Sequence, residues 1–367
     1  MCTYRCETTS EVRRWTLGVG RWTFCSFIVR VLILACFLIC ASARAQVIPA
    51  QSIVYSAHDP AAISQYQANG PRVRAMVNRL VLAVTGEHDL AHAWGSLVAP
   101  NDRIGIKISA AGGELFTTHR DIVNAIVDGL VAAGHPRGNI IVWDRSLGGI
   151  NDAGYRPDKE GYQMKSIAPR DGYDPKAVFT VPLTGNLIWG DLEFRTDRGK
   201  VPFPSEDSTS DDSHFARILS SEVTKVINVP VMSDSGSCGI AGCIYNMTIP
   251  NIDNSRRFTQ SRWGHSAIAE IYKMPIISGK VVLNIMDGLV AQYAGGPQAQ
   301  PNFAVHHATI LASKDPVAID ALAVRQIEEW RAKAWLAPIT PLAQHVQAAA
   351  QLGIGNAEVI EVRNVAP

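Results

Sequence analysis

The feature that most constrains the fold is a strand–helix–strand pattern between residues 103 and 143. The segment RIGIKIS, at 103–109, has the short and mostly apolar composition of a buried strand. Apolar residues at helical spacing then predict a helix from Thr118, which can cap it, to Ala133, with Gly134 placed to end it. The segment NIIVW, at 139–143, predicts a second strand. Such units almost always cross over right-handedly within a parallel sheet, so an open sheet covered by helices is expected.

The same alternation returns after an irregular middle section. Apolar patterns predict further strands over residues 223–229, 280–285, 307–312 and 357–362. Helices are predicted over residues 71–84, 266–272, 315–335 and 341–352. Residues 151–212 are rich in Gly, Pro, Asp and Ser and predict an insertion with a strand at 177–181 and a hairpin around 187–200. We therefore predict an α/β fold, an open and mostly parallel Rossmann-like sheet flanked by helices, with an irregular β-containing insertion.

The first 45 residues have the organisation of an export signal. An apolar run at 31–41 follows several arginines and precedes an Ala-Arg-Ala triplet at 43–45, which predicts cleavage between Ala45 and Gln46. The run is shorter than the roughly 20 residues of a membrane span, so an uncleaved anchor is the lesser alternative. An arginine pair at 13–14 leaves twin-arginine export open beside the general route, and residues 32–36 loosely resemble a lipoprotein site. We expect an exported protein, periplasmic or extracellular, with membrane contact only through this signal.

The predicted organisation is a signal peptide (1–45), a first α/β part (46–150), the insertion (151–212) and a second α/β part (213–367). The 34 Lys and Arg of the chain nearly balance its 33 Asp and Glu, and the signal contains six Arg and two Glu. The part after it is therefore mildly acidic, and no nucleic-acid partner is expected. That part keeps only Cys238 and Cys243, too few for the usual four thiolates of an iron–sulfur cluster.

Four segments, in order, resemble the bacterial and archaeal family called domain of unknown function 362. They are DRIGIKIS at 102–109 with 117–134 behind it, residues 225–246, residues 281–297, and ASKDPVAID at 312–320. The resemblance covers nearly all of residues 90–362 and implies an α/β fold and, for many members, an export signal. It supplies no reaction. The sequence departs from the family at Ser109, where relatives tend to have Asn, and at the two cysteines.

Polar side chains follow the predicted strands, at the edge where open α/β sheets bind their ligands. Lys107 and Ser109 end the strand at 103–109, Asp144 the strand at 139–143, and Asp287 the strand at 280–285. We predict catalytic roles for Lys107, Asp144 and Asp287, and metal binding by Asp234 and Asp287. The predicted ligand-binding residues are Ser109, Gly112, Gly113, His119, Asn246 and Asp315.

Three of these residues also have a purely structural interpretation. Lys107 suits either an anion or base site or an ion pair with Asp144 or Asp287 that joins two strand ends. Asp315 precedes Pro316 and is placed to cap a helix, and Asn246 could fix a turn.

Cys238 and Cys243 occur in the segment CGIAGC. Its glycines would allow a turn, so we predict a disulfide between the two cysteines, with a metal site including His265, His306 or His307 as the alternative.

The predicted function is the binding of a small anionic or metal-bound ligand in a crevice at the strand ends, with proton-transfer or redox-linked chemistry left open. The alternative is a non-catalytic periplasmic binding or accessory protein. The sequence contains no G-x-G-x-x-G, P-loop, G-x-S-x-G or H-E-x-x-H motif, which excludes the common nucleotide, hydrolase and zinc-protease assignments. A bound metal ion is left open as a cofactor.

Overall fold

The computed structural model describes residues 51–156, 159–168, 172–186, 209–259 and 264–366, and the backbone of strands β8 (Arg195–Thr196) and β9 (Gly199–Lys200). The predicted signal peptide and its cleavage site lie outside the described residues. So does most of the predicted hairpin at 187–200, of which β8 and β9 pair antiparallel. Among the described residues, no helix combines the length and apolar character needed to cross a bilayer.

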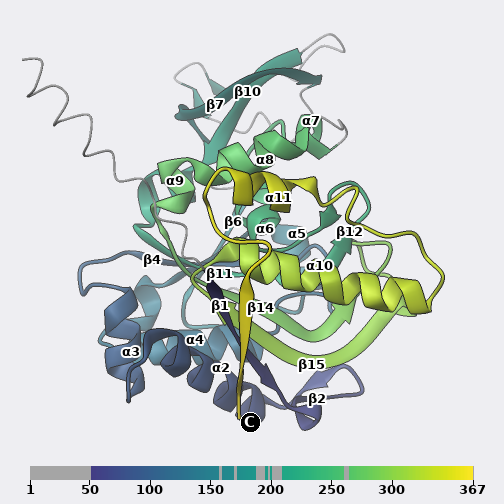
Figure 1. Ribbon diagram of the computed structural model, residues 1–367. Coiled ribbons are helices and arrows are strands. Elements are labelled where there is room, and N and C mark those ends of the chain that lie inside the picture. The colour runs from purple at the N-terminus through teal and green to yellow at the C-terminus, as the bar shows by residue number, and fades with distance from the viewer. Residues whose placement is uncertain are drawn as a thin grey trace, which may run out of the picture. The chain divides into compact units, whose positions relative to one another are not determined.

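A large, mostly parallel sheet forms the centre of the described chain (Figure 1). Neighbouring strands pair in parallel, except that β15 runs antiparallel to β1 and β14. This arrangement confirms the predicted fold class. The strand order is β16 (Ile360–Val365), β1 (Ser52–His58), β15 (Ala304–Ser313), β14 (Val281–Gln292), β11 (Lys225–Val229), β4 (Ile104–Ile108), β5 (Ile141–Ser146) and β6 (Gln163–Ala168).

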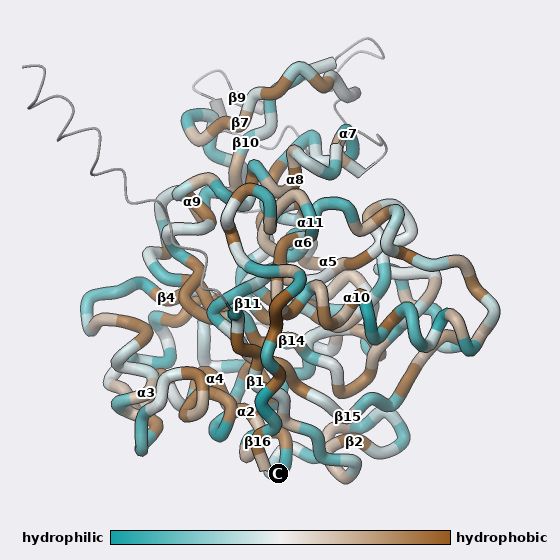
Figure 2. The backbone as a smooth tube through the Cα atoms, viewed as in Figure 1, coloured by the Kyte–Doolittle hydropathy of each residue, from teal (hydrophilic) through white to brown (hydrophobic). Residues whose placement is uncertain are grey.

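Helices cover both faces of this sheet, and apolar segments concentrate between the layers (Figure 2). One face, called here the α4 side, packs against α2 (Gly70–Thr85), α3 (Leu90–Leu97) and α4 (Arg120–Ala132). The opposite face, called the α6 side, packs against α6 (Cys243–Thr248), α8 (Gly264–Lys273), α10 (Pro316–Lys333) and α11 (Gln344–Gln351). Strands buried on both faces have continuous apolar sequences, which is why the pattern at 103–109 identifies β4.

Shorter elements lie near the carboxyl ends of the parallel strands. Strand β12 (Val231–Ser235) pairs with β14 and with β13 (Gly239–Ile240), and α5 (Leu147–Asp152) follows β5 directly. A separate two-stranded sheet joins β7 (Tyr173–Asn186) to β10 (Thr209–Ala216), and α7 (Arg256–Thr259) packs against it. The predicted strand at 177–181 lies within β7. The other described elements are β2 (Ile63–Ser64), β3 (Gln67–Ala68), α9 (Pro275–Ser278) and short 3₁₀ or π turns.

Candidate functional site

A fully buried lysine lies at the centre of the polar groups that follow β4 and β5. The ammonium of Lys107 donates hydrogen bonds to Ile108 O (2.6 Å), Asp144 Oδ1 (2.6 Å) and Asn246 Oδ1 (3.1 Å). Ile106 and Ile108 pack on the α4 side, so the alternation of the strand turns Lys107 towards α6, which carries Asn246. Burial lowers the pKa of Lys107, and the nearby Asp144 carboxylate opposes this shift. All three ammonium protons are used, so Lys107 fixes the positions of Asp144 and Asn246.

A row of asparagine side chains continues this network across the sheet. Asn246 donates to Asn228 Oδ1 (2.8 Å), and Asn228 donates to Asn284 Oδ1 (2.9 Å) and to Cys243 O (3.0 Å). Asn284 donates in turn to Ser313 O (3.4 Å). The three asparagines are buried. A satisfied network in a low-dielectric interior holds its members in one arrangement, so it anchors α6 on β11 and β14.

A cavity of about 220 Å³ lies beside Asp144 and Asn246, at the carboxyl ends of β4 and β5. Open α/β sheets bind ligands at this position. Three of the predicted site residues, Ser109, Asp144 and Asn246, line this cavity. Lys107 lies behind Asp144 and Asn246, to which it is hydrogen-bonded. The polar part of the wall consists of Ser109, Asp144, Arg145, Ser146, Tyr245 and Asn246, and the rest is mostly apolar.

Asp144 is the only acidic side chain among the described residues that line the cavity. One of its oxygens accepts from Lys107, and the other accepts from Ala110 N (2.7 Å). Both carboxylate oxygens therefore already accept a short hydrogen bond from the protein. This arrangement offers few ligands to a metal ion, which prefers several oxygen donors.

Hydrogen-bond donors account for much of the remaining polar wall. The hydroxyls of Tyr245 and Ser109 have no hydrogen-bond partner within the described part of the chain. Burial raises the pKa of Tyr245, although the nearby Arg145 guanidinium acts in the opposite direction, so the phenol keeps its proton at neutral pH. Arg145 also donates to Ser255 Oγ (3.0 Å). A ligand that fits this wall has to bring hydrogen-bond acceptors.

The pattern of polar residues at the strand ends does not identify Arg145, Ser146 or Tyr245. All three are close in sequence to a predicted site residue. Arg145 and Ser146 directly follow Asp144, and Tyr245 directly precedes Asn246. The signal that could have found them is this adjacency: the chain turns directly after a parallel strand, so several successive side chains face the same crevice.

Asp287 and His119 form a separate pair. Asp287 Oδ2 accepts from the backbone N–H of His119 (2.7 Å) and lies 2.7 Å from His119 Nδ1, and Asp287 Oδ1 accepts from Leu289 N (3.1 Å). Burial opposes protonation of His119, but the carboxylate outweighs it and raises the pKa of His119. Leu283 and Ile285 pack on the α4 side, and the alternation of β14 places Asp287 on that side as well. Neither Asp287 nor His119 is among the residues that line the cavity beside Asp144.

Three other predicted ligand-binding residues also lie away from the cavity. Asp315 caps α10, because Asp315 Oδ1 accepts from Val317 N (2.8 Å) and Ala318 N (3.0 Å). The structure therefore supports the capping alternative for Asp315. Gly112 and Gly113 lie in a loop that folds back on itself through a bridge from Gly112 to Phe116.

The predicted metal ligands do not share a site. Asp234 Oδ1 accepts from Gly296 N (2.8 Å), and Asp287 is engaged by His119. Within the described residues, no group of three or more His, Cys, Asp or Glu side chains is arranged to bind a metal ion. The histidines proposed as partners of the cysteines have other surroundings: His306 contacts Tyr66, His307 contacts Trp330, and His265 is buried on α8.

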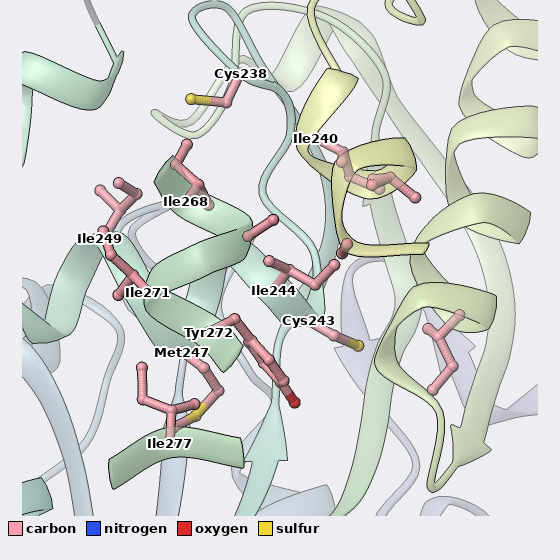
Figure 3. Close-up of a cluster of buried hydrophobic side chains, with 14 of the residues drawn as sticks. Cys238, Ile240, Cys243, Ile244, Met247, Ile249, Ile268, Ile271, Tyr272 and Ile277 are labelled. Atoms are coloured by element: carbon pink, nitrogen blue, oxygen red, sulfur yellow. The ribbon is translucent and has the colours of Figure 1, made fainter. Parts of the chain in front are cut away.

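The structure corrects the predicted disulfide, because Cys238 and Cys243 are both free thiols. Cys238 lies between β12 and β13, and Cys243 begins α6 after a change in chain direction, so their sulfur atoms point away from each other (Figure 3). Burial raises the pKa of both thiols, that of Cys238 to about 11. Buried thiols of this kind are unreactive and pack as small apolar groups.

Comparison with known proteins agrees with the resemblance seen in the sequence. The family model described as domain of unknown function 362 matches residues 104–325, well over half of the chain. A comparison with curated proteins gives no match. A crystal structure of a protein from Thermotoga maritima is similar over 75% of this chain and 61% of that chain, with 10% sequence identity and a TM-score of 0.39. The chain thus spans less than two thirds of that protein, and similarity at this level assigns no function.

Proposed function

The chain belongs to the domain of unknown function 362 family, and from its site we propose that it binds a small organic anion in the cavity beside Asp144. The observation that carries this proposal is the donor-rich wall formed by Arg145, Tyr245 and Ser109. A carboxylate fits such a wall because it brings two acceptor oxygens and pairs well with a guanidinium. The apolar remainder of the wall suits a short carbon chain.

Asp144 supports an anion rather than a metal-bound ligand. Its two oxygens are held by Lys107 and Ala110, so its negative charge is balanced on the side away from the cavity. A cation would have to compete with the ammonium of Lys107 for the same carboxylate. An anion instead meets the hydroxyl of Tyr245, with the guanidinium of Arg145, which also bonds to Ser255, in the same wall.

Binding of acetate and of inorganic phosphate to the purified chain, measured by calorimetric titration, tests the proposal. Arg145→Gln should raise the dissociation constant about tenfold or more, because a hydrogen bond to a charged group contributes roughly 1.5–3 kcal/mol. Tyr245→Phe removes only a hydroxyl and should weaken binding by roughly two- to tenfold. Arg363→Gln is the matched control, since Arg363 lies on β16 and pairs with Glu361. Equal affinities in all variants, or no binding by the wild type, would refute the proposal.

Removal of a proton from the bound anion and its return is a second candidate function, favoured by the Asp144 carboxylate in the cavity wall, whose Oδ1 lies 2.6 Å from Lys107 Nζ. Pyruvate has exchangeable methyl protons and the carboxylate that the wall suits. Incubation of pyruvate with the protein in D₂O, followed by NMR, measures this activity directly. Deuterium entry faster than in buffer indicates an enzyme, whereas unchanged protium content indicates a binding protein only.

We also propose that the chain is exported and that residues 1–45 are removed. The support is the apolar run at 31–41 between arginines and the Ala-Arg-Ala triplet at 43–45. N-terminal sequencing of the protein from the cell envelope and from the cytoplasm tests this. A mature chain beginning at Gln46 is expected, and an intact Met1 in all fractions would contradict cleavage.

A further inference from the structure

We infer that Asp320, on α10, is a positioning residue of the anion cavity, because it holds the first turn of α6 in place. Helix α6 carries both Tyr245 and Asn246, which line the cavity. Asp320 does not line the cavity. The inference rests on the proposed anion binding and adds a residue that controls the shape of the same site.

The contacts of Asp320 supply what α6 lacks. Asp320 Oδ1 accepts from Cys243 N (2.6 Å) and Oδ2 accepts from Ile244 N (3.0 Å), which are the first two amides of the helix. The residue before the helix, Gly242, has no side chain and cannot cap it. A Cβ built on Gly242 would lie 2.1 Å from Asp320 Oδ1, so a glycine is required for this close approach.

Helix α6 depends on such contacts because it is short. It has six residues, and isolated helices of fewer than about 12 residues are marginal in water. Two of its amides are held by a carboxylate 77 and 76 positions away in sequence. Loss of these bonds should loosen the helix first at Cys243 and Ile244, and then displace Tyr245 and Asn246 from the cavity wall.

The surroundings of Asp320 make this hold sensitive to pH. The side chain is fully buried and is faced by Cys243 from α6, by Tyr272 from α8 and by Asp315 at the start of α10. None of these groups is a cation. Burial raises the pKa of Asp320 to about 7, although the amides of Ile244 and Cys243 oppose the shift.

The sign of the pH effect follows from this shift. When α6 opens and water reaches Asp320, its pKa returns towards the ordinary value of about 3.9. The closed state therefore binds more protons than the open state, and the closed state loses stability as pH rises through about 7. Opening of α6 and release of the anion should both increase as pH rises from about 4 to about 7, with little further change above pH 8.

Hydrogen–deuterium exchange of the α6 amides, together with acetate titration, tests the inference on the full chain. In the wild type, exchange corrected for its intrinsic pH dependence should rise by up to about tenfold per pH unit from about pH 5 to pH 7 and level off above about pH 8. Asp320→Asn removes the titrating group, so this pH trend should disappear. At pH 7 the variant should also exchange faster in α6 and bind acetate about tenfold more weakly, because the amide nitrogen of Asn replaces one of the two oxygens that accept from Cys243 N and Ile244 N and cannot accept a hydrogen bond.

Two further variants keep the test decisive. Asp89→Asn removes a capping carboxylate from α3, on the α4 side, and should change α6 exchange and acetate affinity by less than about twofold. Gly242→Ala displaces Asp320 without altering its charge and should also loosen α6, which matters if Asp320→Asn does not fold. Unchanged α6 exchange in both Asp320→Asn and Gly242→Ala would overturn the inference. Failure of the wild type to bind acetate at any pH would instead refute the proposed function, and the exchange data would still decide whether Asp320 holds α6.

Discussion

Replacement of Asp144 by Asn leaves Lys107 as a buried cation without a counter-charge. Asp144 Oδ1 now lies 2.6 Å from Lys107 Nζ, and the lysine has no exposed surface. An isolated charge in such a place is strongly unfavourable, whereas a neutral amine still bonds to Ile108 O and Asn246. We therefore expect Lys107 to lose its proton in the folded variant.

The size of the effect follows from the cost of that deprotonation. A lysine with an ordinary pKa of about 10.4 gives up its proton at pH 7 for about 4.6 kcal/mol, at about 1.36 kcal/mol for each pH unit. This sets the upper limit of the loss in unfolding free energy, and it agrees with the roughly 3–5 kcal/mol found when one partner of a buried pair is removed. The unfolded variant binds one proton more than the folded variant, so its stability should rise by about 1.36 kcal/mol per pH unit up to about pH 10.

Urea unfolding of the wild type and of Asp144→Asn at pH 7, 8 and 9 measures both the loss and its slope. Asp128→Asn is the matched control, because Asp128 forms partly exposed ion pairs with Arg74 and Arg137. Such pairs contribute about 0–1 kcal/mol, so this variant should lose little and show no such slope. A loss below about 1 kcal/mol, or a large loss that is the same at all three pH values, would refute the reasoning that Lys107 is excluded from water.

Two other predictions concern buried groups. Burial lowers the pKa of His345 to about 3. Neither of its ring nitrogens has a hydrogen-bond partner in the described structure. Below about pH 6.5 the folded state therefore binds fewer protons than the unfolded state. Stability should fall as pH decreases from 6.5 towards 3, and His345→Phe should reduce this acid sensitivity in urea unfolding at pH 4 to 7. A Cβ on Gly129 would lie 2.0 Å from Trp94 Nε1, so Gly129→Ala should destabilise by about 1–3 kcal/mol in thermal unfolding. Gly138→Ala, which meets no atom within 4 Å, should change stability by less than about 0.5 kcal/mol.

The parts of the fold that could be predicted from sequence are those whose pattern is local. Strands β4, β5 and β11 are buried on both faces and have continuous apolar sequences, and α4 has apolar residues at helical spacing. Strand β1 was not predicted, because its place between β15 and β16 depends on residues about 250 to 310 positions away. Pairing over such distances leaves little trace in a short segment.

The candidate site divides in the same way. Lys107 and Asp144 end neighbouring parallel strands, so their contact follows once the sheet is predicted. The position of Asp287 depends instead on which face of β14 it occupies, and a shift of one residue reverses that face. Ile285 packs on the α4 side, and Asp287, two positions later, pairs there with His119. One predicted crevice is therefore two separate groups.

The hydrogen bonds of Lys107 limit the chemistry available at the cavity. A lysine acts as a nucleophile only through a free electron pair on a neutral amine, and it must reach the substrate. Here Nζ donates to three acceptors, and Asp144 and Asn246 stand between it and the cavity. Reaction through an imine on Lys107 would require Asn246 to leave both Lys107 and Asn228. The arrangement favours a lysine that holds Asp144 and α6 in position, with ligand contacts left to Arg145 and Tyr245.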